Sequence, residues 1–85
     1  MFYVYVIESL KSGRLYTGFS DNIERRLIEH NSGKTKSTKN RGPWVLMGFI
    51  QKNTRSEAIK LEKKLKSFKR KDRTLSFIKR NGTFK

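Results

Sequence analysis

The segment that follows the first methionine is apolar on both faces of a β-strand. Its side chains alternate between two sets, Phe2, Val4 and Val6 on one face and Tyr3, Tyr5 and Ile7 on the other. Such a strand has to be covered on both sides. A chain of 85 residues buries only about 60–65% of its unfolded surface, so its core is modest. These constraints favour a small sheet with helices packed against it.

Turn and cap signals define the elements that come next. A polar turn over residues 9–13 leads into a second strand over residues 14–19, which closes a hairpin. Asp21 and Glu24 have a spacing that resembles a capping box. We therefore expect a helix that begins there and ends near His30, where an Asn-Ser-Gly run stops it.

The second half of the chain predicts one more strand and two helices. Pro43 leads into a third strand over residues 44–51, and Asn53 or Thr54 caps a helix over about 55–68. A last short helix covers residues 73–79. The sequence thus predicts a single domain over residues 1–85 with an α+β fold: a small three-stranded antiparallel sheet flanked by helices, in the order β-β-α-β-α-α.

The charge of the chain indicates which kind of partner it binds. Lys and Arg number 21 against 7 Asp and Glu, which gives a formal net charge of +14. The isoelectric point near 10.6 exceeds the value of about 9 that marks nucleic-acid-binding domains. Six basic residues are candidates for phosphate contact, and the first four lie in a loop over residues 32–42 that has no acid: Lys34, Lys36, Lys39, Arg41, Lys66 and Lys69.

Several other classes of protein are disfavoured. No stretch approaches the roughly 18 apolar residues of a membrane span, and no basic segment precedes the N-terminal apolar run as in a signal peptide, so we expect a cytoplasmic protein that does not bind membranes. The chain has no cysteine and one histidine, a poor set for zinc. Gly33-Lys34-Thr35 resembles the end of a phosphate-binding loop, but Ile28 stands where that motif needs glycine. We expect no small-molecule cofactor.

The first predicted helix presents two residues with phosphate chemistry. Arg26 and His30 share one helix face through their i,i+4 spacing. A planar guanidinium can clamp a phosphate, and a histidine near neutral pH can hydrogen-bond a phosphate oxygen or a leaving group. The alternative is a surface arginine and a structural histidine that interacts with the helix dipole.

Two tyrosines lie near the middle of the paired strands. The hydroxyl groups of Tyr5 and Tyr16 could open on one cleft, and Gly18 would let a neighbouring group approach closely. A tyrosine becomes a usable base only where cations or a metal-bound hydroxide stabilise its phenolate. The alternative is that both are ordinary aromatic residues of a sheet.

One carboxylate lies at the margin of the apolar stripe on the later helix. That stripe consists of Ala58, Leu61, Leu65 and Phe68, and Glu62 lies beside it. A lone carboxylate at such a margin suits a hard cation that keeps most of its waters, such as Mg²⁺. The alternative is an i,i+4 ion pair with Lys66 on a solvated face.

The order of these residues resembles the GIY-YIG nuclease family. The resemblance rests on Tyr3-Val4-Tyr5, Tyr16-Thr17-Gly18, Arg26, His30 and Leu61-Glu62 in this order and spacing, and it covers roughly residues 2–75. The chain is most similar to the small stand-alone bacterial members, and it is also similar to the N-terminal nuclease domain of the excision-repair endonuclease. Tyr3 and Thr17 replace the glycine and the isoleucine of the family's two motifs.

The resemblance implies a DNA endonuclease, with DNA repair as its setting, that uses one divalent metal ion, Mg²⁺ or Mn²⁺. It implies that Tyr5, Tyr16, Arg26, His30 and Glu62 are catalytic, with Glu62 as the metal ligand and Arg26 as the phosphate-binding residue. One tyrosine activates the attacking water, and we favour Tyr5. Because the chain carries no additional recognition module, we expect it to recognise backbone and shape, as in branched or single-stranded DNA. The alternatives are a non-catalytic basic module that binds DNA or RNA on the same fold, and a small basic protein bound to ribosomal or other RNA.

Overall fold

The computed structural model describes all residues from 1 to 85 and contains four strands and three α-helices. The hairpin consists of β1 (Phe2–Ser9) and β2 (Leu15–Ser20), and α1 (Ile23–Asn31) follows it. A short 3₁₀ helix, η1 (Lys36–Thr38), leads to β3 (Trp44–Lys52). The chain ends with α2 (Arg55–Ser67), α3 (Lys71–Asn81) and β4 (Thr83–Phe84). The α+β class is therefore confirmed.

The sheet is antiparallel and has the strand order β2-β1-β3-β4. The prediction of three strands was wrong, because the last residues return to pair with β3. Phe84 lies opposite Gly48, where a Cβ on Gly48 would come within 2.6 Å of the Thr83 carbonyl oxygen. Both residues of β4 are exposed, so they lack the alternating burial pattern by which a strand is recognised in a sequence.

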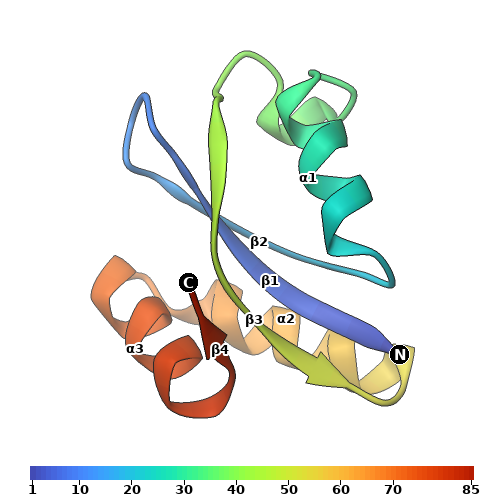
Figure 1. Ribbon diagram of the computed structural model, residues 1–85. Helices are drawn as coiled ribbons and strands as arrows, with labels where there is room; N and C mark the ends of the chain where they lie inside the picture. Colours follow the sequence, from blue (N-terminus) through green and yellow to red (C-terminus); the bar gives the residue numbers. More distant parts are fainter.

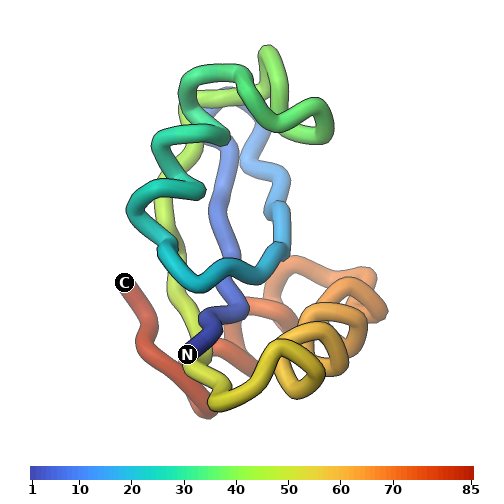
Figure 2. Tube along the Cα trace, turned by 90° about the vertical axis from the view of Figure 1, so that its right-hand side faces the viewer, coloured from blue at the N-terminus to red at the C-terminus, as the bar shows by residue number.

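Helices cover both faces of the sheet (Figures 1 and 2), as the two apolar faces of β1 require. On the face under α2 and α3, the core consists of Val4, Val6, Ile50, Ala58, Leu61, Leu65 and Ile78. On the face under α1, Tyr5, Ile7 and Trp44 form a smaller core, against which Ile23 and Leu27 pack. β1 is thus the shared central strand, and its side chains reach both cores.

The helix caps differ in part from the prediction. Asn22 caps α1, and its side chain accepts a hydrogen bond from the backbone N–H of Arg25 at 3.0 Å. The predicted cap, Asp21, lies one residue too early and pairs with the Arg25 guanidinium at 2.9 Å. Thr54 caps α2 as predicted, in a full capping box with Glu57.

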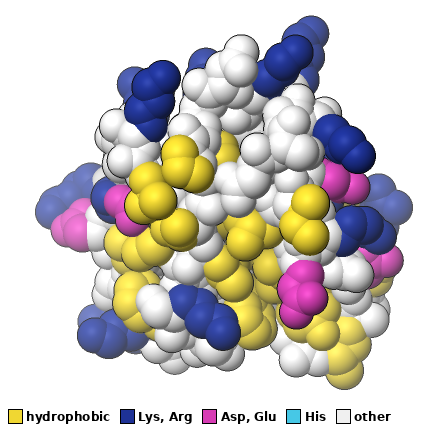
Figure 3. Space-filling view, turned by 45° about the horizontal axis from the view of Figure 1, so that its top comes forward, with side chains coloured by type: hydrophobic (Ala, Val, Ile, Leu, Met, Phe, Trp, Pro, Cys, Tyr) yellow, Lys and Arg dark blue, Asp and Glu magenta, His cyan; other side chains and the backbone are white.

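Surface charge is distributed unevenly. On the face seen in Figure 3, hydrophobic side chains gather in the middle, and most Lys and Arg side chains lie around the margin. A hollow between the start of α1 and β3 is lined by four apolar residues and by four polar or charged ones: Tyr3, Ile23, Leu46 and Phe49, and Asp21, Asn22, Glu24 and Lys85. Its lining holds two acidic residues and one basic residue, so the net charge of +14 is not concentrated there. No helix has the length and apolar composition that a membrane span needs.

Candidate active site

The candidate site lies at the β2 edge of the sheet, where a glycine lets one tyrosine cross its neighbouring strand. Tyr5 in β1 lies opposite Gly18 in β2. A Cβ on Gly18 would lie 2.6 Å from the Tyr5 hydroxyl oxygen and 3.3 Å from a ring carbon of Tyr16. The absence of a side chain at Gly18 thus lets the phenol of Tyr5 lie over β2, beside Tyr16.

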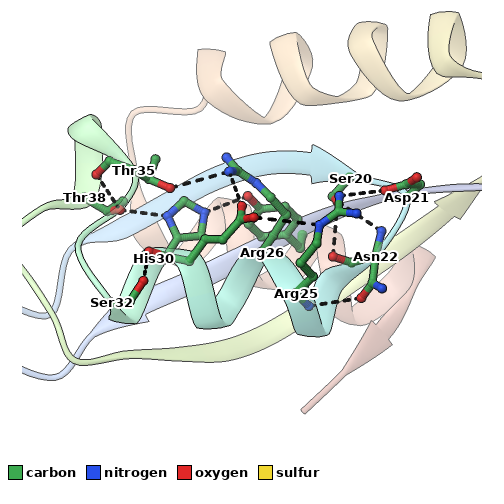
Figure 4. A network of polar contacts seen from close by, with 11 residues as sticks. Ser20, Asp21, Asn22, Arg25, Arg26, His30, Ser32, Thr35 and Thr38 are labelled. Atoms are coloured by element: carbon green, nitrogen blue, oxygen red, sulfur yellow. Dashed lines mark hydrogen bonds and ion pairs between the residues drawn. The ribbon is translucent and has the colours of Figure 1, made fainter.

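A buried hydrogen-bond chain holds the Tyr5 hydroxyl. The Tyr5 hydroxyl oxygen lies 2.8 Å from Nε2 of His30. On the other side of the imidazole, Nδ1 of His30 lies 2.7 Å from Oγ1 of Thr38 (Figure 4). His30 is 1% exposed and Thr38 is fully buried. The Thr38 hydroxyl donates to the Thr35 carbonyl oxygen at 3.4 Å. With the Thr38 hydroxyl as that donor, its oxygen is left to accept from His30, so we assign the imidazole proton to Nδ1 and an acceptor role toward Tyr5 to Nε2.

This chain changes the interpretation of His30. From the sequence, a ring nitrogen of His30 was a candidate for direct contact with a phosphate oxygen or a leaving group. Both ring nitrogens are instead occupied inside the protein. His30 is in contact with the candidate site through Tyr5, and Thr38 joins the set as a residue that no sequence pattern marks.

The titration of these groups is shifted by burial and by their neighbours. Burial lowers the pKa of His30 below its usual value of 6.5, and the charge of Arg26 lowers it further, while Glu29 opposes these effects. His30 is therefore neutral at pH 7 and can accept a proton. Burial raises the pKa of Tyr5 above its usual value of 10.0, although Arg26 counteracts this. Tyr5 is therefore a phenol, and not a phenolate, in the free protein.

The same electrostatic effects show which groups lie together. The Tyr16 phenol and the Glu62 carboxylate are both close enough to Tyr5 to raise its pKa. Arg26 belongs to α1 and Glu62 belongs to α2, and these helices pack on the two different cores of the sheet. Elements from the two faces of the sheet thus bring four of the predicted residues to Tyr5.

Arg26 is held by an acidic neighbour on its own helix. Its Nη1 lies 2.9 Å from Oε1 of Glu29 and 3.5 Å from Oγ1 of Thr35. The hydrogen bond with Glu29 raises the pKa of Arg26 and lowers that of Glu29. The Arg26 side chain keeps 29% of its surface exposed, so a phosphate can approach the part of the guanidinium that Glu29 leaves open. Glu29 was not foreseen, because an i,i+3 pair on a helix is common.

Tyr16 forms the outer wall of the site. Its ring is half-buried and packs edge-on against His30, with the ring centroids 5.0 Å apart, and against Trp44 at 6.3 Å. The ammonium group of Lys66 lies 5.9 Å from the centre of the Tyr16 ring. Tyr16 therefore connects the buried chain on the α1 side with the basic end of α2.

Glu62 fits a cation that makes few bonds to protein. The structure contains no cluster of three or more His, Cys, Asp or Glu side chains suited to a metal ion. Mg²⁺ and Mn²⁺ do not require such a cluster, because Mg²⁺ is usually held by one or two carboxylates, several waters and the phosphates of the substrate. The Glu62 side chain is 18% exposed and lies 3.6 Å from the Lys66 ammonium group. That pair leaves the second carboxylate oxygen of Glu62 without an ion-pair partner.

The six predicted phosphate-contacting residues fall into two groups. Lys34, Lys36, Lys39 and Arg41 are exposed in the segment around η1, which follows α1 directly. Lys66 and Lys69 line a hollow beside Tyr16, at the C-terminal end of α2. Arg14 lines the same hollow and was not predicted, because a single arginine at the start of a strand has no distinguishing pattern.

Comparison with known proteins finds a family model and relatives that cover most of this chain. The model of the GIY-YIG catalytic domain matches residues 1–76. The chain is 44% identical over 69 residues to the UPF0213 protein SSP2268 of Staphylococcus saprophyticus. This match covers 80% of this chain and 83% of the relative. It is 42% identical over 81 residues to a UPF0213 protein of Syntrophus aciditrophicus, covering 93% and 91%. The solution structure of the UPF0213 protein BH0048 from Bacillus halodurans aligns with a TM-score of 0.58 and 32% identity, covering 96% of this chain and 87% of that one.

Proposed function

This chain belongs to the GIY-YIG catalytic-domain family, and we propose that it is a metal-dependent DNA endonuclease that hydrolyses phosphodiester bonds with the help of a tyrosine. The family is in general a nuclease family. The observation that carries the proposal is the hydrogen bond of 2.8 Å between Tyr5 and the neutral His30, beside an arginine and a lone carboxylate.

In the proposed reaction, Tyr5 and His30 act as one proton acceptor. A water molecule attacks the phosphorus atom and gives its proton to the Tyr5 oxygen, while the Tyr5 proton moves to Nε2 of His30. This route does not require a free phenolate, which the raised pKa of Tyr5 disfavours. The bond between phosphorus and the leaving oxygen breaks, and the leaving oxygen takes a proton from solvent.

Arg26, Glu62 and Tyr16 have separate roles in this proposal. Arg26 stabilises negative charge on the phosphoryl oxygens of the transition state. Glu62 would hold Mg²⁺ or Mn²⁺, which supplies further charge neutralisation on the phosphate when bound. Tyr16 lies at the entrance and positions the phosphate or the water. We propose DNA as the substrate, in a branched or single-stranded form, because the chain offers few side chains for reading base edges.

A second candidate function is a basic module that binds DNA or RNA without cutting it. One observation favours it: both charged groups that the reaction needs already have partners, Arg26 with Glu29 at 2.9 Å and Glu62 with Lys66 at 3.6 Å. A module of this kind would bind nucleic acid equally well with and without divalent metal ions.

Cleavage assays with one matched pair of variants separate the two functions. Supercoiled, linear, single-stranded and branched DNA are incubated with Mg²⁺, Mn²⁺ or EDTA. We expect metal-dependent nicking by the parent protein, and loss of nicking with affinity kept or slightly raised in Glu62→Gln. Glu24→Gln is the control, because it removes the same charge from an exposed position on α1 and should cut normally. If Glu62→Gln cuts at the parental rate, Glu62 is only a surface residue. If the parent binds but never cuts, the binding module is correct.

A further inference from the structure

Two hollows adjoin beside the candidate site and together form a path across the surface. The first has a volume of about 490 Å³, and Arg14, Tyr16, Lys66 and Lys69 are among the residues that line it. The second lies between the β1–β2 turn and the end of the loop around η1, and is lined by Lys11, Ser12, Arg14, Asn40 and Arg41. Ser12 and Arg14 line both hollows, so the two are neighbours at this turn.

All the charged residues that line the path are basic, since no Asp or Glu lines either hollow. Three of these cations have partners: Lys71 pairs with Glu8, Arg70 with Asp72 at 2.7 Å, and Lys66 with Glu62 at 3.6 Å. Arg14, Lys69 and Arg41, in contrast, take part in none of the ion pairs of the structure. Neighbouring unpaired cations without acids suit a ligand with repeated negative charge.

The turn that carries Arg14 is fixed relative to the loop that carries Arg41. The buried hydroxyl of Ser9 accepts hydrogen bonds from the backbone N–H groups of Lys11 and Ser12, each at 3.1 Å, and donates to the Arg41 carbonyl oxygen at 2.6 Å. On the other side, Lys71 donates to the Gly13 carbonyl oxygen at 3.0 Å. The two basic groups predicted separately from the sequence are therefore connected by a preorganised segment, which lowers the entropy cost of binding a long ligand.

From these observations we propose that the path is a binding track for a single DNA strand next to the cut site, with Arg14 at its centre. This inference rests on the proposed nuclease function. The track includes Tyr16, which packs against His30, so a strand that follows it passes the candidate site. Tyr16 and Phe68 both line this hollow and are aromatic side chains of the kind on which bases stack.

We assign one strand to the track, because the two hollows share Ser12 and Arg14 at one turn, and aromatic side chains line the path together with the cations. The backbones of a duplex border a major groove about 12 Å wide, and would need two rows of cations. A single strand, or the single-stranded arm of a branched DNA, needs one row with adjacent stacking surfaces. This distinction gives the track a specificity for nucleic-acid structure that requires no reading of bases.

Binding measurements in EDTA test the track without any cleavage. A fluorescent single-stranded oligonucleotide is titrated with the parent and with Arg14→Ala, Arg14→Lys and Lys79→Ala, across a range of salt concentrations. Lys79 is the matched control, because it is exposed on α3, lines neither hollow and forms no ion pair. Each alanine variant loses one charge, so an effect of net charge alone would be equal in both.

We expect Arg14→Ala to weaken binding about tenfold, the effect of one lost charged hydrogen bond, and to reduce the log–log salt slope by about 0.7, the value for one phosphate contact on a single strand. Arg14→Lys should retain the salt slope, and Lys79→Ala should bind as the parent does. A duplex of equal length should bind more weakly and respond less to Arg14→Ala. Equal effects of the two alanine variants, or a larger effect of Arg14→Ala on the duplex, would overturn the proposal. Because metal and cleavage are absent from this assay, it can fail independently of the nuclease function.

Discussion

Replacement of Thr38 with valine tests whether the buried hydrogen-bond chain controls the chemistry of Tyr5. Valine keeps the branched shape of threonine but cannot accept a hydrogen bond. Thr38 is fully buried, so the Nδ1–H group of His30 would be left without its acceptor. A buried donor without a partner costs about 1–3 kcal/mol, which should appear as a loss of unfolding free energy.

The imidazole can escape this cost by moving its proton from Nδ1 to Nε2. In that tautomer Nε2 of His30 donates to Tyr5 and can no longer take its proton. A difference of about 1–3 kcal/mol corresponds to a factor of about 5–150 in the population of the productive tautomer. We therefore expect single-turnover cleavage by Thr38→Val to slow by about this factor, with unchanged affinity for DNA.

Two assays together check this prediction. His30 is the sole histidine of the chain, so the ¹⁵N chemical shifts of its ring report the tautomer without ambiguity, even if the protein cuts no substrate tested. The parent should show the proton on Nδ1, and Thr38→Val should shift toward Nε2. Thr38→Ser restores the hydroxyl and should restore both the tautomer and the rate. A proton on Nε2 in the parent would refute the reasoning, and so would a folded Thr38→Val variant with parental tautomer and rate.

Three further predictions concern the groups around this hydrogen-bond chain. Tyr5→Phe should slow single-turnover cleavage by about 10²–10⁴-fold at unchanged affinity, with a smaller effect from Tyr16→Phe; two folded variants that cut at the parental rate would exclude a tyrosine mechanism. Gly18→Ala puts a Cβ within 2.6 Å of the Tyr5 hydroxyl oxygen, so it should displace Tyr5 from His30 and lower both the melting temperature and the rate; an unchanged His30 NMR spectrum would contradict this. Because the folded-state pKa of His30 lies below its usual 6.5, the unfolded chain binds the extra proton first. The neutral, buried His30 therefore contributes its full share of the unfolding free energy above pH 6.5, and that share is lost as the pH falls through the folded-state pKa of His30. Urea unfolding at a series of pH values should show this decline in the parent and not in His30→Gln.

The sequence predicts the elements that have internal periodicity. The apolar stripe of α2 is visible as Ala58, Leu61 and Leu65, and all three are buried in the core. The two apolar faces of β1 predict cover on both sides, which the two cores provide. β4 could not be predicted, because two exposed residues have no period and their pairing depends on the space that Gly48 leaves.

In the candidate site too, the sequence predicts some features and not others. Tyr5, Tyr16, Arg26, His30 and Glu62 are identified by their order, and the structure gathers them. Their contacts could not be predicted, because they depend on which rotamer and which neighbour fill the space beyond the backbone. Thr38 is eight residues from His30 in the sequence, and only the path of the loop through η1 brings its hydroxyl to Nδ1 at 2.7 Å. The connection between the β1–β2 turn and this loop through Ser9 is equally invisible in the sequence.

The position of the site follows from the order of the strands. Arg26 on α1 and Glu62 on α2 lie on opposite faces of the sheet, so they can approach one phosphate only around an edge. β2 forms one edge, and β4 adds to the other, which leaves the β2 edge open. Gly18 removes the side chain that would stand at this edge, and the Tyr5 hydroxyl passes through the space. A strand paired to β2 would close the site, whereas the extra strand at β3 leaves it accessible. The β2 edge is therefore the one place in this small fold where a tyrosine from the central strand, an arginine from one layer and a carboxylate from the other can approach the same phosphodiester.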